Sequence, residues 1–255
     1  MKNENSEQSF YDKLASIYHL IFEDWDISMR EQGKVLSHLI PPPDIASPIL
    51  DCACGIGTQS LGLASLGYQV EGSDLSHSEI RRAQKEASVR GLSINFRVDD
   101  MRQLKTAPLS HYGVVMCMDN SLPHLDSSED LFNSLTAMRD RLKNGGVLLI
   151  SLRDYKKLLE DRPNVMPPKF FQNGKYRRFV HQIWDWVDER RYVVHLYITY
   201  ETAEGWKSHH SVGHYRAVTV EEIVSFMEKV GFIDIRILEP AKTGYYQPIV
   251  SGRAP

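Results

Sequence analysis

The sequence lacks several features that would place it in a specialised class of protein. Its 255 residues include only three cysteines, which cannot all pair and which form no disulfide-framework pattern. That scarcity favours a reducing compartment, so we expect a cytoplasmic location. The longest strongly apolar stretch, Val114–Met118, is far shorter than the roughly 18 residues that span a bilayer. Because the polar Met1–Ser9 also has no signal-peptide core, we expect no membrane attachment.

An excess of basic charge is lacking as well. The chain has 30 lysine and arginine residues against 33 aspartate and glutamate residues, which gives a net charge of −3. Dedicated nucleic-acid binders usually carry a basic domain or stripe, so we expect no nucleic-acid partner. Lys175–Arg178 forms a local basic patch with an aromatic neighbour, and it keeps an RNA ligand open as a weaker alternative.

What the sequence does have is the composition of an ordinary folded domain. Hydrophobic residues make up 42% of the chain and charged residues 25%, which excludes disorder as the dominant state. A length of 255 residues exceeds the typical domain of about 150, and it predicts one large domain, 1–255, or one domain with an elaboration.

Apolar periodicity predicts a helical region followed by alternating strands and helices. Helical spacing runs through residues 10–40 and ends at Pro41–Pro43, which gives an N-terminal helical segment at 1–43. Strands are predicted at 48–54, 68–72, 94–98, 112–118 and 147–152, with helices at 59–66, 76–90 and 126–142 and a turn at 144–146. Strands joined by single helices indicate parallel crossovers, and thus an α/β fold with a doubly wound, mostly parallel sheet.

The pattern changes after residue 153. Segments rich in tyrosine, tryptophan, valine and histidine predict antiparallel strands at 176–186, 190–200 and 206–215. A helix at 219–230 and strands at 232–238 and 246–251 complete a main sheet of seven strands. We interpret residues 154–217 as an inserted antiparallel lid or side sheet within a single domain.

Three polar motifs follow successive parallel strands, at the edge where open sheets bind ligands. The first is the turn Asp51–Gly57, in which Gly55 and Gly57 let the backbone approach a ligand. Asp74 follows the second strand and can accept the hydroxyls of a ribose. Asp100–Met101 follows the third, where a carboxylate can accept the amine of adenine while a methionine lies on the ring. Together the motifs predict a nucleotide-like ligand.

Each motif also has a structural explanation. Glycine pairs are common in tight turns, and Ser60 in place of a third glycine means that this turn is not a complete dinucleotide fingerprint. Asp74 has the alternative of capping a helix, although Ser76 followed by Glu79 forms a better capping box. The third motif has the alternative of a solvated turn.

No metal site is predicted. Cys52 and Cys54 have the spacing of a metal pair but lack two further ligands at suitable spacing, so we predict buried fillers. His209, His210 and His214 fall in a predicted strand, where adjacent side chains point to opposite faces and at least one would be misdirected.

On these motifs, residues 45–152 resemble the class I S-adenosylmethionine-dependent methyltransferases, and the seven-stranded layout to residue 252 resembles them more loosely. The resemblance implies S-adenosylmethionine as cofactor, with its methionine moiety on the glycine turn, its ribose on Asp74 and its adenine beside Asp100. Ala53 stands where the family usually has the first glycine. The cofactor-binding residues implied are Tyr11, Asp51, Ala53, Gly55, Gly57, Asp74, Leu75, Asp100, Met101 and Met118.

Polar groups after the fourth and fifth strands predict the acceptor site. Asn120 offers both an acceptor and two donors, which suits the orientation of an amine. Arg153 presents a planar fork that matches a carboxylate. Its alternative is a salt bridge to Asp154 or Asp119. We assign Asn120 and Arg153 as the catalytic positions.

Within the superfamily, Cys117–Leu125 together with Arg153 looks most like the glycine and sarcosine N-methyltransferases, where an asparagine and an arginine hold the amino acid. Aminosugar N-methyltransferases share a related Ser-x-x-His-Leu segment. In similar enzymes, tyrosines of the N-terminal segment and the lid close over the reacting groups. The substrate-binding residues implied are Asn120, His124, Arg153, Tyr176, Tyr215 and Tyr246.

The resemblance therefore implies an S-adenosylmethionine-dependent methyltransferase of small molecules, with N-methylation of a glycine-like amino acid as the main expectation. The alternatives are methylation of an aminosugar, a sugar nucleotide or another metabolite on nitrogen or oxygen, and a cofactor-binding module without activity. In-line displacement by a neutral amine needs little acid–base help, so alignment and exclusion of water are expected to carry the rate.

Overall fold

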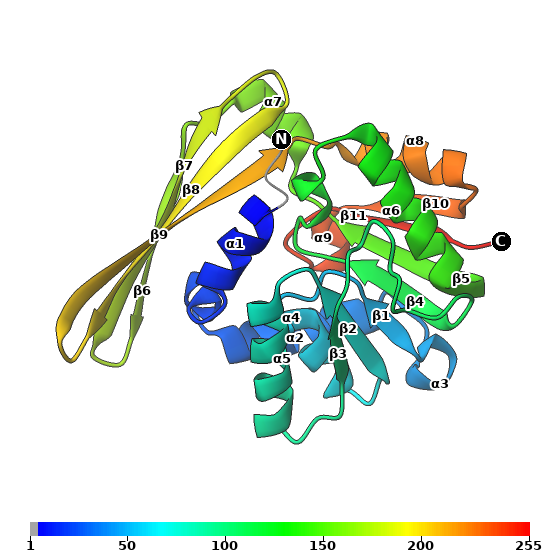
Figure 1. Ribbon diagram of the computed structural model, residues 1–255, viewed down its shortest axis with the longest axis horizontal. Helices are drawn as coiled ribbons and strands as arrows, with labels where there is room; N and C mark the ends of the chain where they lie inside the picture. The colour runs from blue at the N-terminus through cyan, green and yellow to red at the C-terminus, as the bar shows by residue number, and fades with distance from the viewer. Residues whose placement is uncertain (1–4) are drawn as a thin grey trace.

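A seven-stranded sheet forms the centre of the computed structural model, which describes residues 5–255 (Figure 1). Its strand order is β10-β11-β5-β4-β1-β2-β3. These strands are β1 Ile49–Asp51, β2 Val70–Asp74, β3 Asn95–Val98, β4 Tyr112–Cys117, β5 Leu142–Ser151, β10 Ile233–Leu238 and β11 Ile249–Arg253. β11 runs antiparallel to β5 and β10, while the other neighbours pair in parallel. The predicted doubly wound, mostly parallel sheet of seven strands is confirmed.

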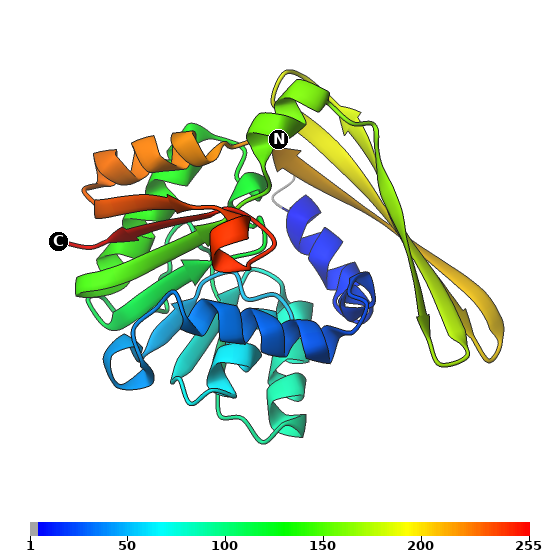
Figure 2. The same ribbon diagram turned by 180° about the vertical axis from the view of Figure 1, so that it is seen from behind.

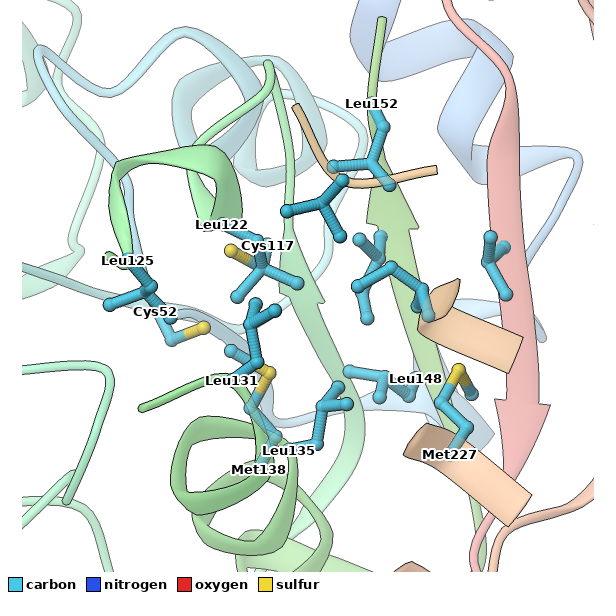
Figure 3. Close-up of a cluster of buried hydrophobic side chains, with 14 of the residues drawn as sticks. Cys52, Cys117, Leu122, Leu125, Leu131, Leu135, Met138, Leu148, Leu152 and Met227 are labelled. Atoms are coloured by element: carbon cyan, nitrogen blue, oxygen red, sulfur yellow. The ribbon is translucent and has the colours of Figure 1, made fainter. Parts of the chain in front are cut away.

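Helices cover both faces of this sheet because its central strands are apolar on both sides. The helices are α1 Asn5–Leu14, η1 Tyr18–Ile21, α2 Trp25–Ser37, α3 Pro43–Ala46, α4 Thr58–Ala64, α5 His77–Val89, η2 Leu122–His124, α6 Ser128–Arg141, α7 Tyr155–Asp161, α8 Val220–Val230 and α9 Pro240–Thr243. On one face, α6 and α8 close a core cluster that includes Leu135, Leu148 and Met227 (Figure 3). On the other, α2 and α4 bury Leu36 and Leu63.

The three cysteines are free and buried. Cys52 and Cys117 lie in the cluster under α6 (Figure 3), whereas Cys54 packs in a different cluster with side chains of α2, α4 and α5. The sheet therefore separates the two cysteines that have the spacing of a metal pair.

Two glycines let α2 cross α4 at unusually close range. A Cβ atom on Gly33 would lie 2.5 Å from the carbonyl carbon of Gly62, and one on Gly62 would lie 2.4 Å from the carbonyl oxygen of Met29. Both distances are too short for any side chain. The close crossing brings Gln32 of α2 within 2.8 Å of the Gln59 side chain, directly beneath the carboxyl ends of the strands.

Several predicted boundaries differ from the structure, since the first strand ends at Asp51 instead of residue 54 and the last begins at Ile249 instead of residue 246. The turn expected at 144–146 lies inside β5, where Leu142 already pairs with Tyr112 and the register shifts before Val147. Gly145, with a φ of 73°, makes this irregularity within the strand instead of a separate turn. The helical region expected through residue 40 is broken into α1, η1 and α2, and its continuation to residue 1 lies outside the described residues.

A second sheet, called here the lid sheet, stands beside the first and projects away from it (Figures 1 and 2). Its antiparallel strands are β6 Val165–Asn173, β7 Tyr176–Trp186, β8 Arg191–Thr202 and β9 Gly205–Arg216. This confirms the antiparallel insertion after the fifth strand. The interpretation of 1–43 and 154–217 as distinct segments stays a prediction.

The sequence did not reveal β6, because Pro167 and Pro168 interrupt its pattern. β6 is an edge strand, and its register shifts between Met166 and Lys169, where the two prolines lie. An edge position with an irregular register is where a strand tolerates proline.

The lid sheet packs on α1. Phe10 and Leu14 of α1 join Val180, Leu196 and Ile198 of β7 and β8 in one buried cluster. This contact holds α1 between the two sheets (Figure 2), over the carboxyl ends of the parallel strands. None of the helices within residues 5–255 is long and apolar enough to cross a membrane.

Candidate functional site

A cavity of about 680 Å³ opens where the carboxyl ends of β1, β2, β3 and β4 meet α1. Its walls combine residues of all these elements, including Tyr11, Tyr18, Ala53, Cys54, Gly55, Gln59, Asp74, Leu75, Glu79, Asp100, Met101, Asp119, Ser121, His124 and His214. Seven of the ten residues expected to bind the cofactor line this cavity: Tyr11, Ala53, Gly55, Asp74, Leu75, Asp100 and Met101. The three motifs that were predicted from separate strands are thus brought together.

The glycine turn takes backbone angles that favour glycine. Gly55 and Gly57 have φ values of 52° and 92°, both in the left-handed region. Gly57 precedes α4 and lies outside the cavity wall, where a Cβ atom would meet the Leu61 side chain at 3.3 Å. Its role is therefore to shape the turn that presents Gly55.

Asp51 supports the turn from below. Its side chain is fully buried, and its Oδ2 accepts a hydrogen bond of 2.7 Å from the Ser60 hydroxyl. Burial raises the pKa of Asp51 to about 7, and its other oxygen, Oδ1, is buried without a partner. Met118 is likewise buried, in the core cluster between the sheet and α2. Neither residue lines the cavity.

Asp74 is held by two backbone amides. Its Oδ2 accepts a hydrogen bond of 3.0 Å from the Gly55 N–H, and its Oδ1 accepts one of 2.9 Å from the Ser76 N–H. The carboxylate therefore ties the glycine turn to the start of α5. It lines the cavity while doing so, and each oxygen keeps a lone pair for a ligand.

Asp99 and Asp100, the two acidic residues after β3, have different partners. Asp99 accepts hydrogen bonds from the backbone of Lys105 and Thr106 and fixes the loop. Asp100 Oδ2 accepts two hydrogen bonds from the Arg102 guanidinium, one of 2.9 Å from Nε and one of 2.6 Å from Nη2. Asp100 is thus an ion-pair partner as well as a cavity wall, and neighbouring Met101 supplies the apolar surface beside it.

Tyr11 and His124 bridge α1 to the loop after β4. Burial lowers the pKa of His124 to about 4, so the ring is neutral near pH 7. Its Nδ1 lies 3.0 Å from the carbonyl oxygen of His214, which can only accept, so Nδ1 carries the proton. Nε2 therefore accepts the hydrogen bond of 2.6 Å that the Tyr11 hydroxyl donates.

Asn120 and Arg153 meet next to the wall residues Asp119 and Ser121, but neither of them lines the cavity itself. The backbone N–H of Arg153 donates to Asn120 Oδ1 at 3.1 Å, which fixes the orientation of the amide and leaves its Nδ2 as the free end. The Arg153 guanidinium lies 4.9 Å from the ring centroid of Trp184 and 5.7 Å from that of Tyr215. Asn120 Nδ2 and Arg153 Nη1 are both buried and have no hydrogen-bond partner within residues 5–255. Two residues joined by a hydrogen bond therefore each carry an unsatisfied donor.

The alternative salt bridge of Arg153 is not formed in the described part of the chain. The Asp119 oxygens accept from Gln59 at 2.7 Å and from Tyr245 at 2.6 Å, and Tyr246 also donates to this carboxylate. Asp154 caps α7 by accepting from the Lys157 N–H. Burial opposes the charge of Arg153, but the surrounding tyrosines raise its pKa above the ordinary value.

The predicted substrate tyrosines do not all come together. The Tyr215 ring packs against His124, with centroids 4.1 Å apart, and so lies beside the wall. Tyr246 reaches Asp119, a wall residue. Tyr176 begins β7 at the turn after β6, on the end of the lid sheet that points away from the main sheet (Figure 1). The structure thus does not bring Tyr176 to the site.

Several wall residues were not assigned from the sequence, among them Gln59, Glu79 and Asp119. Asp119 lies two residues after the end of β4, and its place after an apolar strand was a signal that could have found it. Gln59 and Glu79 lie in the first turns of α4 and α5, and their helical pattern gave no sign of a role in the cavity.

Comparison with known proteins agrees with this geometry. A family described as a methyltransferase domain matches residues 49–146. The ubiquinone biosynthesis O-methyltransferase of Coxiella burnetii (strain Dugway 5J108-111) is 31% identical over 60% of this chain and 68% of its own length. A glycine/sarcosine N-methyltransferase of Parasynechococcus marenigrum (strain WH8102) is 29% identical over 54% of this chain, and the match spans about half, 48%, of that relative.

A solved structure shares the whole architecture. CalS10 of Micromonospora echinaspora, an amino pentose methyltransferase in complex with S-adenosylmethionine, superposes with a TM-score of 0.71 at 18% identity. The superposition covers 94% of this chain and 95% of CalS10, so it extends over the lid sheet as well as the main sheet.

Proposed function

Since the chain belongs to the class I S-adenosylmethionine-dependent methyltransferases, we propose that it methylates the amine of a small acceptor that also carries a carboxylate. The main candidate is a glycine-like amino acid. The observation that carries the proposal is the pair of buried, unsatisfied donors, Arg153 Nη1 and Asn120 Nδ2, next to the cofactor cavity.

The cavity fits S-adenosylmethionine, which is the cofactor. Its volume falls within the roughly 300–1,000 Å³ of small-molecule sites, and the Gly55 backbone faces it without a side chain. We assign Ala53 and Gly55 to the methionine moiety, Asp74 and Leu75 to the ribose, and Asp100 and Met101 to the adenine. When bound, S-adenosylmethionine supplies a methyl group on a positively charged sulfur.

The orientation of Asn120 changes the role expected from its sequence position. Its oxygen is engaged by the backbone of Arg153, so the free end is a donor and not an acceptor. A donor suits an oxygen of the substrate better than an amine. We therefore propose that Asn120 and Arg153 together hold the carboxylate of the acceptor. The rings of Trp184 and Tyr215, over which the guanidinium lies, keep it in place.

His124 is a positioning residue in this proposal. Its Nδ1 already carries a proton and its Nε2 is occupied by the Tyr11 hydroxyl, so the ring has no free site for a proton from the amine. The amine must therefore enter neutral, and the proton of the methylated product passes to solvent. The bond from Tyr11 to His124 instead holds α1 closed over the cavity and excludes water.

Arg153→Ala provides the first test. We expect the KM for glycine or sarcosine to rise by about 10- to 100-fold, since hydrogen bonds to charged groups contribute roughly 1.5–3 kcal/mol. The affinity for S-adenosylmethionine should stay unchanged in calorimetry. Arg162→Ala is the matched control, because the Arg162 guanidinium lies over Trp186 in the same way but donates to the carbonyl oxygen of Glu189 on the exposed surface. Unchanged acceptor kinetics in Arg153→Ala would refute the carboxylate site.

An aminosugar or sugar nucleotide is the second candidate acceptor. The amino pentose methyltransferase superposes over the lid sheet, whereas the match to the glycine/sarcosine enzyme covers 54% of this chain. A panel of amino acids, amines and sugar nucleotides, with release of the demethylated cofactor as the readout, distinguishes the two. Turnover of sugar nucleotides alone would favour the second candidate. A cytoplasmic location and the absence of a nucleic-acid partner stay predictions.

A further inference from the structure

Glu79 is a buried carboxyl group in the cavity that the proposed function does not use. It lies in the first turn of α5, its exposed fraction is 1%, and it lines the cavity. Its Oε1 is buried without a hydrogen-bond partner. Because such an atom lowers the stability of the folded state, it is a sign of a group that a ligand satisfies.

The capping box expected at this helix is only half formed, and this frees the Glu79 side chain. Ser76 Oγ accepts a hydrogen bond of 3.1 Å from the Glu79 N–H, as a helix cap should. The Ser76 N–H, which Glu79 would otherwise reach, donates to Asp74. The carboxyl instead faces the glycine turn, where a Cβ atom on Gly55 would lie 3.5 Å from Glu79 Oε2 and 3.8 Å from Oε1.

The groups that face Glu79 from neighbouring elements carry negative charge or none. Tyr11 of α1, Tyr18 of η1 and Cys54 of the turn stay neutral because burial raises the pKa of each. Asp74 of β2 is held as an acceptor of two backbone amides. Asp12 of α1 accepts from the Ser76 hydroxyl at 2.6 Å and from the Ser78 N–H at 3.0 Å.

These surroundings set the protonation of Glu79. Burial, and after it the charges of Asp74 and Asp12, raise its pKa well above the ordinary value. Because the carboxyl is buried and the described groups that face it bring no positive charge, its protonated form is favoured. A positive charge brought into the cavity would reverse this preference, since an opposite charge nearby favours the ionised carboxylate.

We propose that Glu79 makes the cavity selective for the cationic sulfonium cofactor over its neutral thioether product by exchanging a proton with solvent. Glu79 gives up its proton as S-adenosylmethionine binds and regains it once the methyl group, and with it the positive charge on sulfur, has left. The product S-adenosylhomocysteine is then held less tightly and is released. The proposal rests on the cofactor alone and is independent of the acceptor.

Calorimetry on the unmodified protein tests the exchange. Titrations in two buffers of different ionisation enthalpy give the number of protons released on binding. We expect S-adenosylmethionine to release close to one proton more than S-adenosylhomocysteine, and its affinity to rise with pH by up to about tenfold per unit. Equal proton exchange for both ligands would overturn the proposal, whatever the acceptor is.

Glu79→Gln removes the titrating group while keeping the shape of the side chain. We expect it to abolish the extra proton release and to lower the ratio of the two affinities by about tenfold, the equivalent of one pKa unit. Glu86→Gln is the control, because Glu86 lies on the same helix and pairs with Arg82 and Arg90. A folded Glu79→Gln that keeps the wild-type ratio would contradict the proposal. If it fails to fold, the calorimetry of the unmodified protein still decides.

Discussion

Burial sets the charge of single residues throughout this site. It raises the pKa of Asp51 to about 7 beneath the glycine turn, and it lowers that of His124 to about 4 in the wall. The same desolvation thus raises the pKa of an acid beneath the glycine turn and lowers that of a base in the cavity wall, because a low dielectric disfavours whichever form is charged. The hydrogen-bond partners then determine which atom donates and which accepts, as in the pair of Tyr11 and His124.

His124→Asn tests this effect through the pH dependence of stability. The folded pKa of His124 lies below its unfolded value near 6.5, so its stabilising contribution is present above pH 6.5 and is lost as the pH falls toward 4. Between pH 6.5 and 5, urea unfolding of the wild type should lose about 2 kcal/mol that His124→Asn retains. Parallel pH profiles for the two proteins would show that His124 is not buried as a neutral ring.

At the scale of elements, two features position the residues of the site: the close crossing of α2 and α4, and the left-handed backbone after β4. Two residues shortly after β4, Asp119 and Asn120, have φ values of 56° and 66°, which are uncommon for residues other than glycine. This conformation directs Asp119 to Gln59 and Tyr245, and Asn120 to the Arg153 backbone. The crossing of α2 and α4 provides the partners for Asp119, since it brings Gln32 into contact with Gln59, which donates to Asp119.

Gly33→Ala should therefore destabilise the protein, although alanine is the better helix former. Helix propensity alone would stabilise this variant by about 1 kcal/mol, whereas the new Cβ atom meets the Gly62 backbone and forces the helices apart. We expect a net loss of roughly 1–3 kcal/mol in the free energy of unfolding, measured with urea. Lys34→Ala, at the adjacent exposed position of α2, is the control. An unchanged or higher stability would mean that the crossing adapts.

At the scale of the whole molecule, the lid sheet and the main sheet share the N-terminal segment between them. Arg178 of β7 donates to the carbonyl oxygens of Leu20 at 2.9 Å and of Glu23 at 2.7 Å, and it also reaches that of Phe22. One lid arginine thus caps the end of η1. Because α1 and η1 contribute Tyr11 and Tyr18 to the cavity, the lid sheet supports the cofactor site from a distance.

Arg178→Ala should loosen this segment without unfolding the main sheet. We expect amide hydrogen exchange in residues 10–23 to rise and the affinity for S-adenosylmethionine to fall by about tenfold, given roughly 1.5–3 kcal/mol for hydrogen bonds of a charged group. The neighbouring Arg177 is the matched control, because it points to the opposite face of the lid sheet and pairs with Glu201. Equal exchange in the two variants would exclude the capping role.

Residue pattern alone predicted much of the fold. Apolar strands, the glycines after them and the capping residue Ser76 are local signals, and the structure has them where the sequence predicted them. The pattern failed at β6 and at residues 144–146, where tertiary pairing at an edge or across an irregular register overrode the local preference of proline and glycine. The cofactor motifs could be predicted from the sequence for the same reason, because each one follows its own strand in the chain.

The sequence by itself determined the order of strands and helices, the glycine turn and the acidic residues that follow β2 and β3, because short-range sterics and hydrophobic spacing act between neighbours in the chain. Only the tertiary structure decided which end of the Asn120 amide is free, that the Arg153 guanidinium lies over lid aromatics, and that Glu79 faces Gly55 with an unsatisfied oxygen. Those properties depend on burial and on partners from distant segments, and no local pattern encodes them.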